Sequence, residues 1–264
     1  MLDVKNISKT FNAGTVNEKT ALNGLSLHLN EGDFVTVIGG NGAGKSTLLN
    51  AVAGVWPVDE GTITIGGVDV THMPEHKRAR YIGRVFQDPM MGTAATMQIE
   101  ENLALAMRRG KPRTLRIGIT KEEREQYKEM LKILDLGLED RLTSKVGLLS
   151  GGQRQALTLV MATLKKPKLL LLDEHTAALD PKTAEKVLRL TELLIAEDHL
   201  TAMMVTHNMS DAIRLGNKLI MMNEGNVAVK IEGERKHGLQ REDLVALFES
   251  ASGGKLENDR MLLS

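Results

Sequence analysis

Two short stretches of the sequence have the residue types and the spacing to bind phosphate. The first, GGNGAGKST at residues 39–47, follows the apolar run FVTVI and continues into the helical pattern STLLNAVAG. Its glycines let the backbone turn so that successive N–H groups point at phosphate oxygens. Lys45 can neutralise the β- and γ-phosphates, and Ser46 can ligate Mg²⁺. Because a strand, a glycine-rich loop and a helix occur in the required order, the stretch predicts an ATP-binding loop.

The second stretch, LSGGQ at residues 149–153, opens another apolar helical pattern, QALTLVMATL. A serine and two glycines at such a position are typical of a helix end whose N–H groups bind an anion. The phosphate loop already provides a binding site for the phosphates of one nucleotide. The sequence therefore raises the question of what the second anion site contacts.

Two carboxylates follow a strongly apolar run, LLLLDE, at residues 169–174. The four leucines predict a buried strand, and its end is the place where open parallel sheets bind their ligands. There Asp173 could hold a metal ion through water, and Glu174 could orient and polarise an attacking water molecule. By itself the hexapeptide fits equally well an acidic turn after a core strand, but the phosphate loop favours the catalytic interpretation.

Three further residues gain a meaning only beside these motifs. Gln87 in VFQDP would alone be interpreted as a solvated loop amide. His207 ends the apolar run MMVTHN, at the edge that carries Asp173 if the two strands are neighbours, and could hydrogen-bond a γ-phosphate there. Phe11 precedes the first glycine-containing loop, and alone it fits a core residue better than a base-stacking one.

Taken together, GGNGAGKST, FQDP, LSGGQ, LLLLDE, ALD and THN occur in the order found in the ATP-binding-cassette (ABC) ATPases, and the chain resembles that family from Leu2 to about Gly233. LSGGQ is the family's signature sequence, and together with a phosphate loop it is highly specific. In this family the signature helix binds the γ-phosphate of the ATP that the opposite subunit holds. The resemblance thus implies an ATP-sandwich homodimer, with ATP and Mg²⁺ as cofactors, and it accounts for the second anion site.

The resemblance implies a role for each matching position. Glu174 matches the catalytic carboxylate, His207 the switch histidine, and Gln87 a glutamine that contacts the metal and couples to the membrane subunits. Phe11 takes the place of an adenine-stacking aromatic that is usually tyrosine, and His175 stands where a proline is common. The implied catalytic residues are Lys45, Gln87, Glu174 and His207; the implied metal site is Ser46, Gln87 and Asp173; and the implied nucleotide contacts are Phe11, Gly39, Asn41, Gly42, Ala43, Gly44, Lys45, Ser46, Thr47, Ser150, Gly151, Gly152, Gln153 and Asp180.

Hydrophobic periodicity predicts an α/β fold around these motifs. The expected strands cover residues 2–7, 24–30, 33–39, 167–174, 200–208, 218–225 and 226–233, with a hairpin at 60–71 that turns at Gly66 and Gly67. The expected helices cover residues 99–109, 121–137, 151–164 and 181–197. Apolar runs separated by helices indicate a buried parallel sheet. With the resemblance, this predicts a P-loop NTPase (RecA-like) core, an N-terminal antiparallel β subdomain and an inserted α-helical subdomain.

The same pattern predicts the domain boundaries. We expect one ABC ATPase domain over residues 1–233, with a helical subdomain at about 91–164 and the RecA-like core plus β subdomain at about 1–90 and 165–233. Residues 234–264 are expected to form one short helix and a mobile polar tail.

Composition excludes several classes of protein. Lys+Arg and Asp+Glu both number 34, so the chain has no net positive charge that would attract nucleic acid. No nucleic-acid partner is therefore expected. The absence of cysteine excludes a disulfide framework and fits a cytosolic protein. The N-terminus lacks the apolar stretch of a signal peptide, and no apolar run approaches the roughly 18–20 residues of a spanning helix. Attachment to a membrane therefore requires a partner.

Two functions remain. The first is the ATP-hydrolysing subunit of a membrane ABC transporter, peripheral on the inner face of the cell membrane through permease subunits. The resemblance favours an importer of a small solute, an amino acid or a related one, to which a solute-binding protein outside the cell could contribute. The alternative is a soluble ABC ATPase acting on DNA, ribosomes or protein assemblies, although no coiled-coil insertion or zinc module of such proteins is visible. A small-molecule kinase does not explain LSGGQ or His207.

Two surfaces are left with open interpretations. Met90, Met91 and Met97 follow Gln87 and could either contact a membrane partner or pack inside the helical segment. The basic stretch MRRGKPRTLR at residues 107–116 could be a solvated loop or a contact for phospholipid headgroups or nucleic acid.

Overall fold

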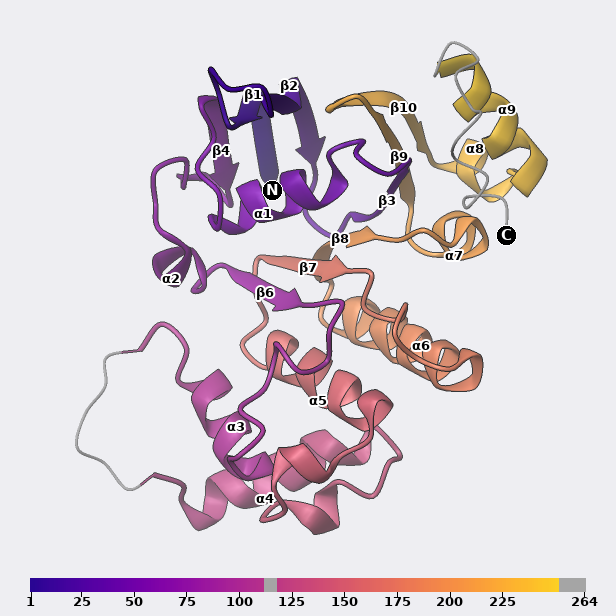
Figure 1. Cartoon of the computed structure of the whole chain (residues 1–264). Coiled ribbons are helices and arrows are strands. Elements are labelled where there is room, and N and C mark those ends of the chain that lie inside the picture. The colour runs from indigo at the N-terminus through magenta and orange to yellow at the C-terminus, as the bar shows by residue number, and fades with distance from the viewer. Residues whose placement is uncertain (112–117, 252–264) are drawn as a thin grey trace.

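Figure 1 shows the computed structural model of the chain, in which the structure describes residues 1–111 and 118–251. An antiparallel sheet forms the N-terminal part, with the strand order β2-β1-β4-β5. The strands are β1 (Leu2–Phe11), β2 (Lys19–Leu29), β4 (Glu60–Ile65) and β5 (Val68–Asp69). The predicted hairpin joins β4 to β5, and Gly66 and Gly67 both have the positive φ that a tight two-residue turn requires.

The second sheet has six strands in the order β10-β9-β3-β8-β7-β6. Its strands are β3 (Phe34–Gly39), β6 (Ile82–Val85), β7 (Leu169–Asp173), β8 (Thr201–Val205), β9 (Lys218–Asn223) and β10 (Asn226–Glu232). Strands β3 and β6 to β9 run parallel, so their carboxyl ends meet at one edge. The phosphate loop, the two carboxylates and the histidine all follow strands at this edge.

The expected parallel sheet is present, but its edge strand β10 departs from it. The apolar runs after residue 167 predict a parallel sheet, but β10 pairs with β9 antiparallel and alternates in exposure at the sheet edge. Only Glu224 and Gly225 connect the two strands, and both have positive φ. A parallel pair requires a crossover of a dozen or more residues, so this tight connection permits only a hairpin.

The helices over the predicted ranges are present, and shorter ones occur that periodicity does not predict. Figure 1 shows α3, α4 and α5 grouped together on the side of the molecule away from the antiparallel sheet. The helices are α1 (Lys45–Ala53), α2 (Glu75–Arg78), α3 (Ile99–Met107), α4 (Lys121–Lys132), α5 (Gly151–Thr163), α6 (Pro181–Glu197), α7 (Met209–Arg214), α8 (Glu234–His237) and α9 (Arg241–Ala251), with 3-10 turns at Glu139–Arg141 and Val146–Leu148. No helix in the described ranges is long and apolar enough to cross a bilayer.

The hydrophobic core lies on both faces of the six-stranded sheet. Leu169 and Leu171 of β7 pack in one cluster with α1 and the antiparallel sheet. Leu170 and Leu172 point the other way and pack in a second cluster with α3, α5 and α6. Because successive strand residues face opposite sides, the run of four leucines serves both layers. A third cluster joins β9, β10, α7 and α9.

Candidate functional site

The phosphate loop leaves β3 and enters α1 through backbone that only glycine can form. A Cβ on Gly39 would lie 2.4 Å from the Met222 carbonyl oxygen, and one on Gly44 would lie 2.5 Å from that of Ala21. Gly44 takes the N-cap position of α1 with φ 100°, and no described side chain caps this helix end. The first N–H groups of α1 are thus left for an anion. The Lys45 ammonium is buried at this end and donates to the carbonyls of Gly39 at 2.7 Å and Gly40 at 3.1 Å.

Asp173, at the end of β7, faces two cations. Its carboxylate lies 3.6 Å from the Arg84 guanidinium, which comes from the neighbouring strand β6. Burial raises the pKa of Asp173, whereas Arg84 and then Lys45 lower it. Arg84 is itself held by Asn50 of α1 at 2.8 Å and stacks over the Phe86 ring at 4.6 Å. The sequence motifs do not predict this role of Arg84. The one signal that points to it is a charged residue inside the short apolar run before FQDP.

Glu174 and His207 come together at the same edge. Strands β7 and β8 are neighbours, as expected, with Asp173 opposite Val205. His207 Nε2 lies 2.6 Å from Glu174 Oε1, and the Glu174 side chain is 12% exposed against 42% for His207. Glu174 has φ 43°, the left-handed region that few residues other than glycine adopt. Such strained backbone persists where the surrounding structure fixes it, as at functional sites.

The aromatic residue expected to stack on adenine is half-buried at the end of β1. The Phe11 ring meets the Trp56 ring edge to face, with centroids 5.1 Å apart, and the Lys9 ammonium lies 5.7 Å from the Phe11 centroid. Trp56 follows α1, the helix that the phosphate loop begins. Sequence reasoning misses Trp56, although it is the only tryptophan of the chain.

Gln87 is exposed just after β6 and therefore at the carboxyl edge of the sheet. The loop that carries it is anchored from the signature helix, because the Gln155 amide of α5 donates to the Phe86 carbonyl at 2.9 Å. Met90 and Met91 in this loop are 58% and 68% exposed. Met97 is half-buried, and its carbonyl accepts the Val146 N–H.

The signature motif forms the first turn of α5. The Ser150 hydroxyl accepts the Gln153 N–H at 3.3 Å, and the Gln153 amide oxygen accepts the Ser150 N–H at 3.1 Å, a reciprocal cap. A Cβ on Gly152 would lie 2.1 Å from Thr183 Cγ2 of α6, so this position requires glycine. Asp180 caps α6 by accepting the Thr183 N–H at 3.1 Å, and hydrogen bonding to the side chain and then to the backbone of Thr183 lowers the pKa of its carboxyl. The two helix ends therefore pack against each other, and Ser150 and Asp180 are exposed.

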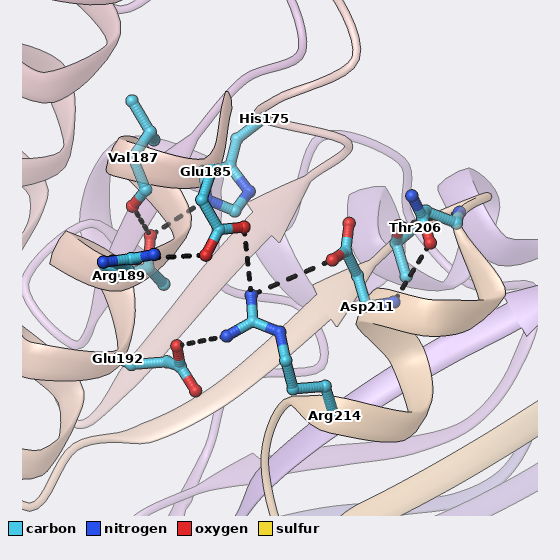
Figure 2. A network of polar contacts seen from close by, with 10 residues as sticks. His175, Glu185, Val187, Arg189, Glu192, Thr206, Asp211 and Arg214 are labelled. Atoms are coloured by element: carbon cyan, nitrogen blue, oxygen red, sulfur yellow. Dashed lines mark hydrogen bonds and ion pairs between the residues drawn. The ribbon is translucent and has the colours of Figure 1, made fainter. Parts of the chain in front are cut away.

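An arginine of α7 ties this helix to α6, as Figure 2 shows. Arg214 binds Glu192 at 2.8 Å and lies 3.8 Å from both Glu185 and Asp211. The two glutamates belong to α6, which Asp180 caps, and α7 begins two residues after His207. The network therefore connects the segments on which Asp180 and His207 lie.

His175, next to Glu174, anchors the segment after β7 to α6. Its Nε2 lies 3.0 Å from the Thr191 hydroxyl, which donates to the Val187 carbonyl at 2.8 Å (Figure 2). The hydroxyl proton is thus used, so Nε2 of His175 carries the hydrogen of this pair. The ring is 1% exposed, and burial lowers the pKa of His175 to about 4. It therefore stays neutral at physiological pH.

The structure separates the expected site residues into two groups. Residues 39–47, Gln87, Asp173, Glu174 and His207 follow strands at one edge of the six-stranded sheet. The signature residues lie at the start of α5, which packs on the opposite face of that sheet from α1. One copy of the chain thus presents residues 39–47 and the N-terminal end of α5 on different sides of the sheet. Of the basic stretch 107–116, residues 112–116 lie outside the described part, as does most of the expected tail, 252–264.

A glycine-rich phosphate loop after the buried parallel strand β3, with two carboxylates at the end of β7 on the same sheet edge, defines a P-loop ATPase. The chain belongs to the ABC transporter family, whose profile matches residues 22–177. It is accordingly an ATP-binding, ATP-hydrolysing subunit of an ABC transporter, and the expected fold class is confirmed.

Curated relatives and solved structures agree with this assignment. The chain is 42% identical over 251 residues to the tyrosine transport ATP-binding protein of Clostridioides difficile (strain R20291), covering 95% of this chain and 100% of that one. It is 38% identical to the sulfate/thiosulfate import ATP-binding protein CysA of Acinetobacter baylyi, but spans only 60% of its length. The dimeric post-hydrolysis state of the ATP-binding cassette MJ0796, bound to ADP and Pi, superposes with a TM-score of 0.75 at 30% identity, covering 88% of this chain and 98% of that one.

Proposed function

We propose that two copies of this chain hold two ATP molecules between them and hydrolyse them to power import of a small solute of the amino-acid class. The observation that carries the proposal is the placement of residues 39–47 and Ser150 on opposite sides of the six-stranded sheet. In a two-fold dimer, each copy can offer its signature helix end to the phosphate loop of the other. The dimeric MJ0796 structure supports this arrangement.

In each composite site, Glu174 orients the attacking water and takes up its proton. His207, 2.6 Å from that carboxylate, donates a hydrogen bond to a γ-phosphate oxygen and so distinguishes ATP from ADP. The partner's α5 N–H groups attract the same γ-phosphate through the helix dipole. Hydrolysis removes this attraction, and with it the interaction that favours the closed dimer.

Mg²⁺ fits the donors at this edge. Ser46, Gln87 and Asp173 offer hydroxyl, amide and carboxylate oxygens, which are the ligands that Mg²⁺ prefers. The described residues contain no group of three or more His, Cys, Asp or Glu side chains that could hold a metal by themselves. This suits an ion that completes its shell with phosphate oxygens and water. When bound, Mg²⁺ neutralises charge on the reacting phosphates.

The loop after Gln87 is the surface that we assign to the permease, at the cytoplasmic face of the membrane. Met90 and Met91 expose flexible apolar side chains that can adapt to an irregular partner. Gln155 connects this loop to α5, so a movement of the signature helix is transmitted to the loop. The half-buried Met97 belongs to the internal packing instead.

The solute class rests on the relatives. The tyrosine transport protein is matched over its full length, which supports an amino acid, and the sulfate relative is named as an import protein. We infer that the permease, with a solute-binding protein outside the cell, makes the contacts that select the solute.

A tagged Glu174→Gln variant tests the proposal. Loss of the general base should lower ATP hydrolysis about 100-fold or more while ATP binding persists, so that ATP traps the dimer. The variant is isolated with ATP from mildly solubilised native membranes, and co-purifying proteins are identified by mass spectrometry. We expect a polytopic membrane protein. A Glu174→Gln, Ser150→Arg double variant is the control, because it keeps the phosphate loop but blocks the signature helix end.

Other outcomes contradict the proposal in different ways. Recovery as a dimer with ribosomes or DNA-associated proteins would favour a soluble ABC ATPase. A Glu174→Gln protein that stays monomeric with ATP and hydrolyses it at the wild-type rate would exclude the composite site.

A further inference from the structure

A lysine of the antiparallel sheet reaches the phosphate loop from outside the known motifs. The Lys19 ammonium lies 3.3 Å from the position that a Cβ would take on Gly42, in the middle of the loop. Its strand is held there by backbone packing, because a Cβ on Gly44 would lie 2.5 Å from the carbonyl oxygen of Ala21, two residues after Lys19. Lys19 thus lies next to the loop through its side chain, and Ala21 through its backbone carbonyl.

The register of the antiparallel sheet places Lys19 beside the expected adenine site. Lys19 is the β2 partner of Phe11 on β1. Lys19 therefore lies between the aromatic ring at the end of β1 and the loop that receives the phosphates. In a nucleotide that spans these two points, the ribose and the α-phosphate lie in between, and of these two the α-phosphate is the anionic group that an ammonium attracts.

The Lys19 ammonium is available for such a contact. Lys19 is exposed, and within residues 1–111 and 118–251 no hydrogen bond or ion pair engages its ammonium. Lys9, two residues before Phe11 on β1, differs in this respect because its ammonium binds Asp59 at 2.7 Å. An ammonium beside a loop of backbone N–H groups adds to a local positive field and favours a phosphate there.

We propose that Lys19 is a further nucleotide-binding residue, whose ammonium contacts the α-phosphate of the adenine nucleotide. The proposal deepens the proposed function and rests on it. Lys45 acts on the β- and γ-phosphates, and the γ-phosphate is lost on hydrolysis. The α-phosphate is present in both ATP and ADP, so Lys19 strengthens the binding of both equally and does not contribute to the switch between them.

The test compares Lys19→Met, which keeps the length of the side chain and removes its charge, with Lys19→Arg, which keeps the charge. Dissociation constants are measured by calorimetry for ADP, and for ATP in a Glu174→Gln background that suppresses hydrolysis. We expect Lys19→Met to bind both nucleotides about tenfold more weakly, equivalent to about 1.4 kcal/mol, a loss in the range of a charge pair at a protein surface. Lys19→Arg should bind within about twofold of the wild type.

Lys5→Met is the matched control, since Lys5 is an exposed lysine of the same sheet, six residues before Phe11 and thus about 20 Å away along the strand. It should bind nucleotide like the wild type. Equal affinities of Lys19→Met and the wild type would overturn the proposal, and so would a loss confined to ATP, which would place the ammonium at the γ-phosphate. If the wild-type chain binds no adenine nucleotide, the proposed function itself fails.

Discussion

A buried lysine near the C-terminus gives a pH dependence of stability that follows from its surroundings. Lys236 in α8 is fully buried, and its ammonium donates to the backbone carbonyls of Leu215 and Gly216, the latter at 3.0 Å. Burial lowers the pKa of Lys236 from 10.5 to about 8. The charged form is disfavoured because two carbonyls do not replace the water that the ammonium loses. We expect Lys236→Met to remove this pH-dependent part of the stability.

The sign follows from proton counting. Between pH values of about 8 and 10.5, the unfolded chain still holds a proton that the folded chain has released. The free energy of unfolding therefore rises with pH across this window and is flat below it with respect to this residue. A difference of about 2.5 between the two pKa values corresponds to about 3 kcal/mol over the whole window.

Urea unfolding of the wild type and of Lys236→Met, from about pH 7 to about pH 9.5, measures the effect. Above pH 8 the wild type should gain about 1.4 kcal/mol per pH unit relative to the variant. Lys230→Met, at an exposed lysine of β10, serves as the control and should keep the wild-type slope. Parallel pH profiles for the wild type and Lys236→Met would refute the reasoning.

Two further predictions concern the site. Gly152→Ala should destabilise the fold by about 1–3 kcal/mol and lower ATP hydrolysis, because its Cβ would lie 2.1 Å from Thr183 Cγ2. Adding Thr183→Ser, which removes that methyl group, should restore both the melting temperature and the ATPase rate. If Gly152→Ala melts at the same temperature as the control Gly151→Ala, the packing argument is contradicted. Arg84→Met should raise the pKa of Asp173, because Arg84 lowers it in the wild type. The acidic limb of the ATPase pH profile should therefore move to higher pH, whereas Arg84→Lys, which keeps the charge, should leave it in place. An unchanged acidic limb in Arg84→Met would show that Asp173 does not set it.

Much of the fold could be predicted because its signals are local. Four leucines before Asp173 and the glycines of the phosphate loop specify a strand end and a turn within a few residues of chain. Strand order and direction depend on more distant pairing, and apolar content alone does not distinguish the parallel β9 from the antiparallel β10. The tight Glu224–Gly225 connection carried that information.

The same limit applies to the candidate site. The motifs locate the residues that follow the strands, but not those that hold them from elsewhere in the chain. Arg84 reaches Asp173 across two strands that lie far apart in sequence, and Gln155 reaches Phe86 from another helix. Such pairs depend on sheet register and helix packing, which a single sequence does not fix.

The position of the phosphate loop and the signature helix end on opposite faces of one sheet has a genetic consequence in the proposed dimer. A Lys45→Ala chain damages the site that its own loop forms, whereas a Ser150→Arg chain damages the site of its partner. Dimers of either variant alone contain two defective sites. A mixed dimer of the two gathers both defects into one site and leaves the other intact, so two inactive alleles should complement each other when they are expressed together.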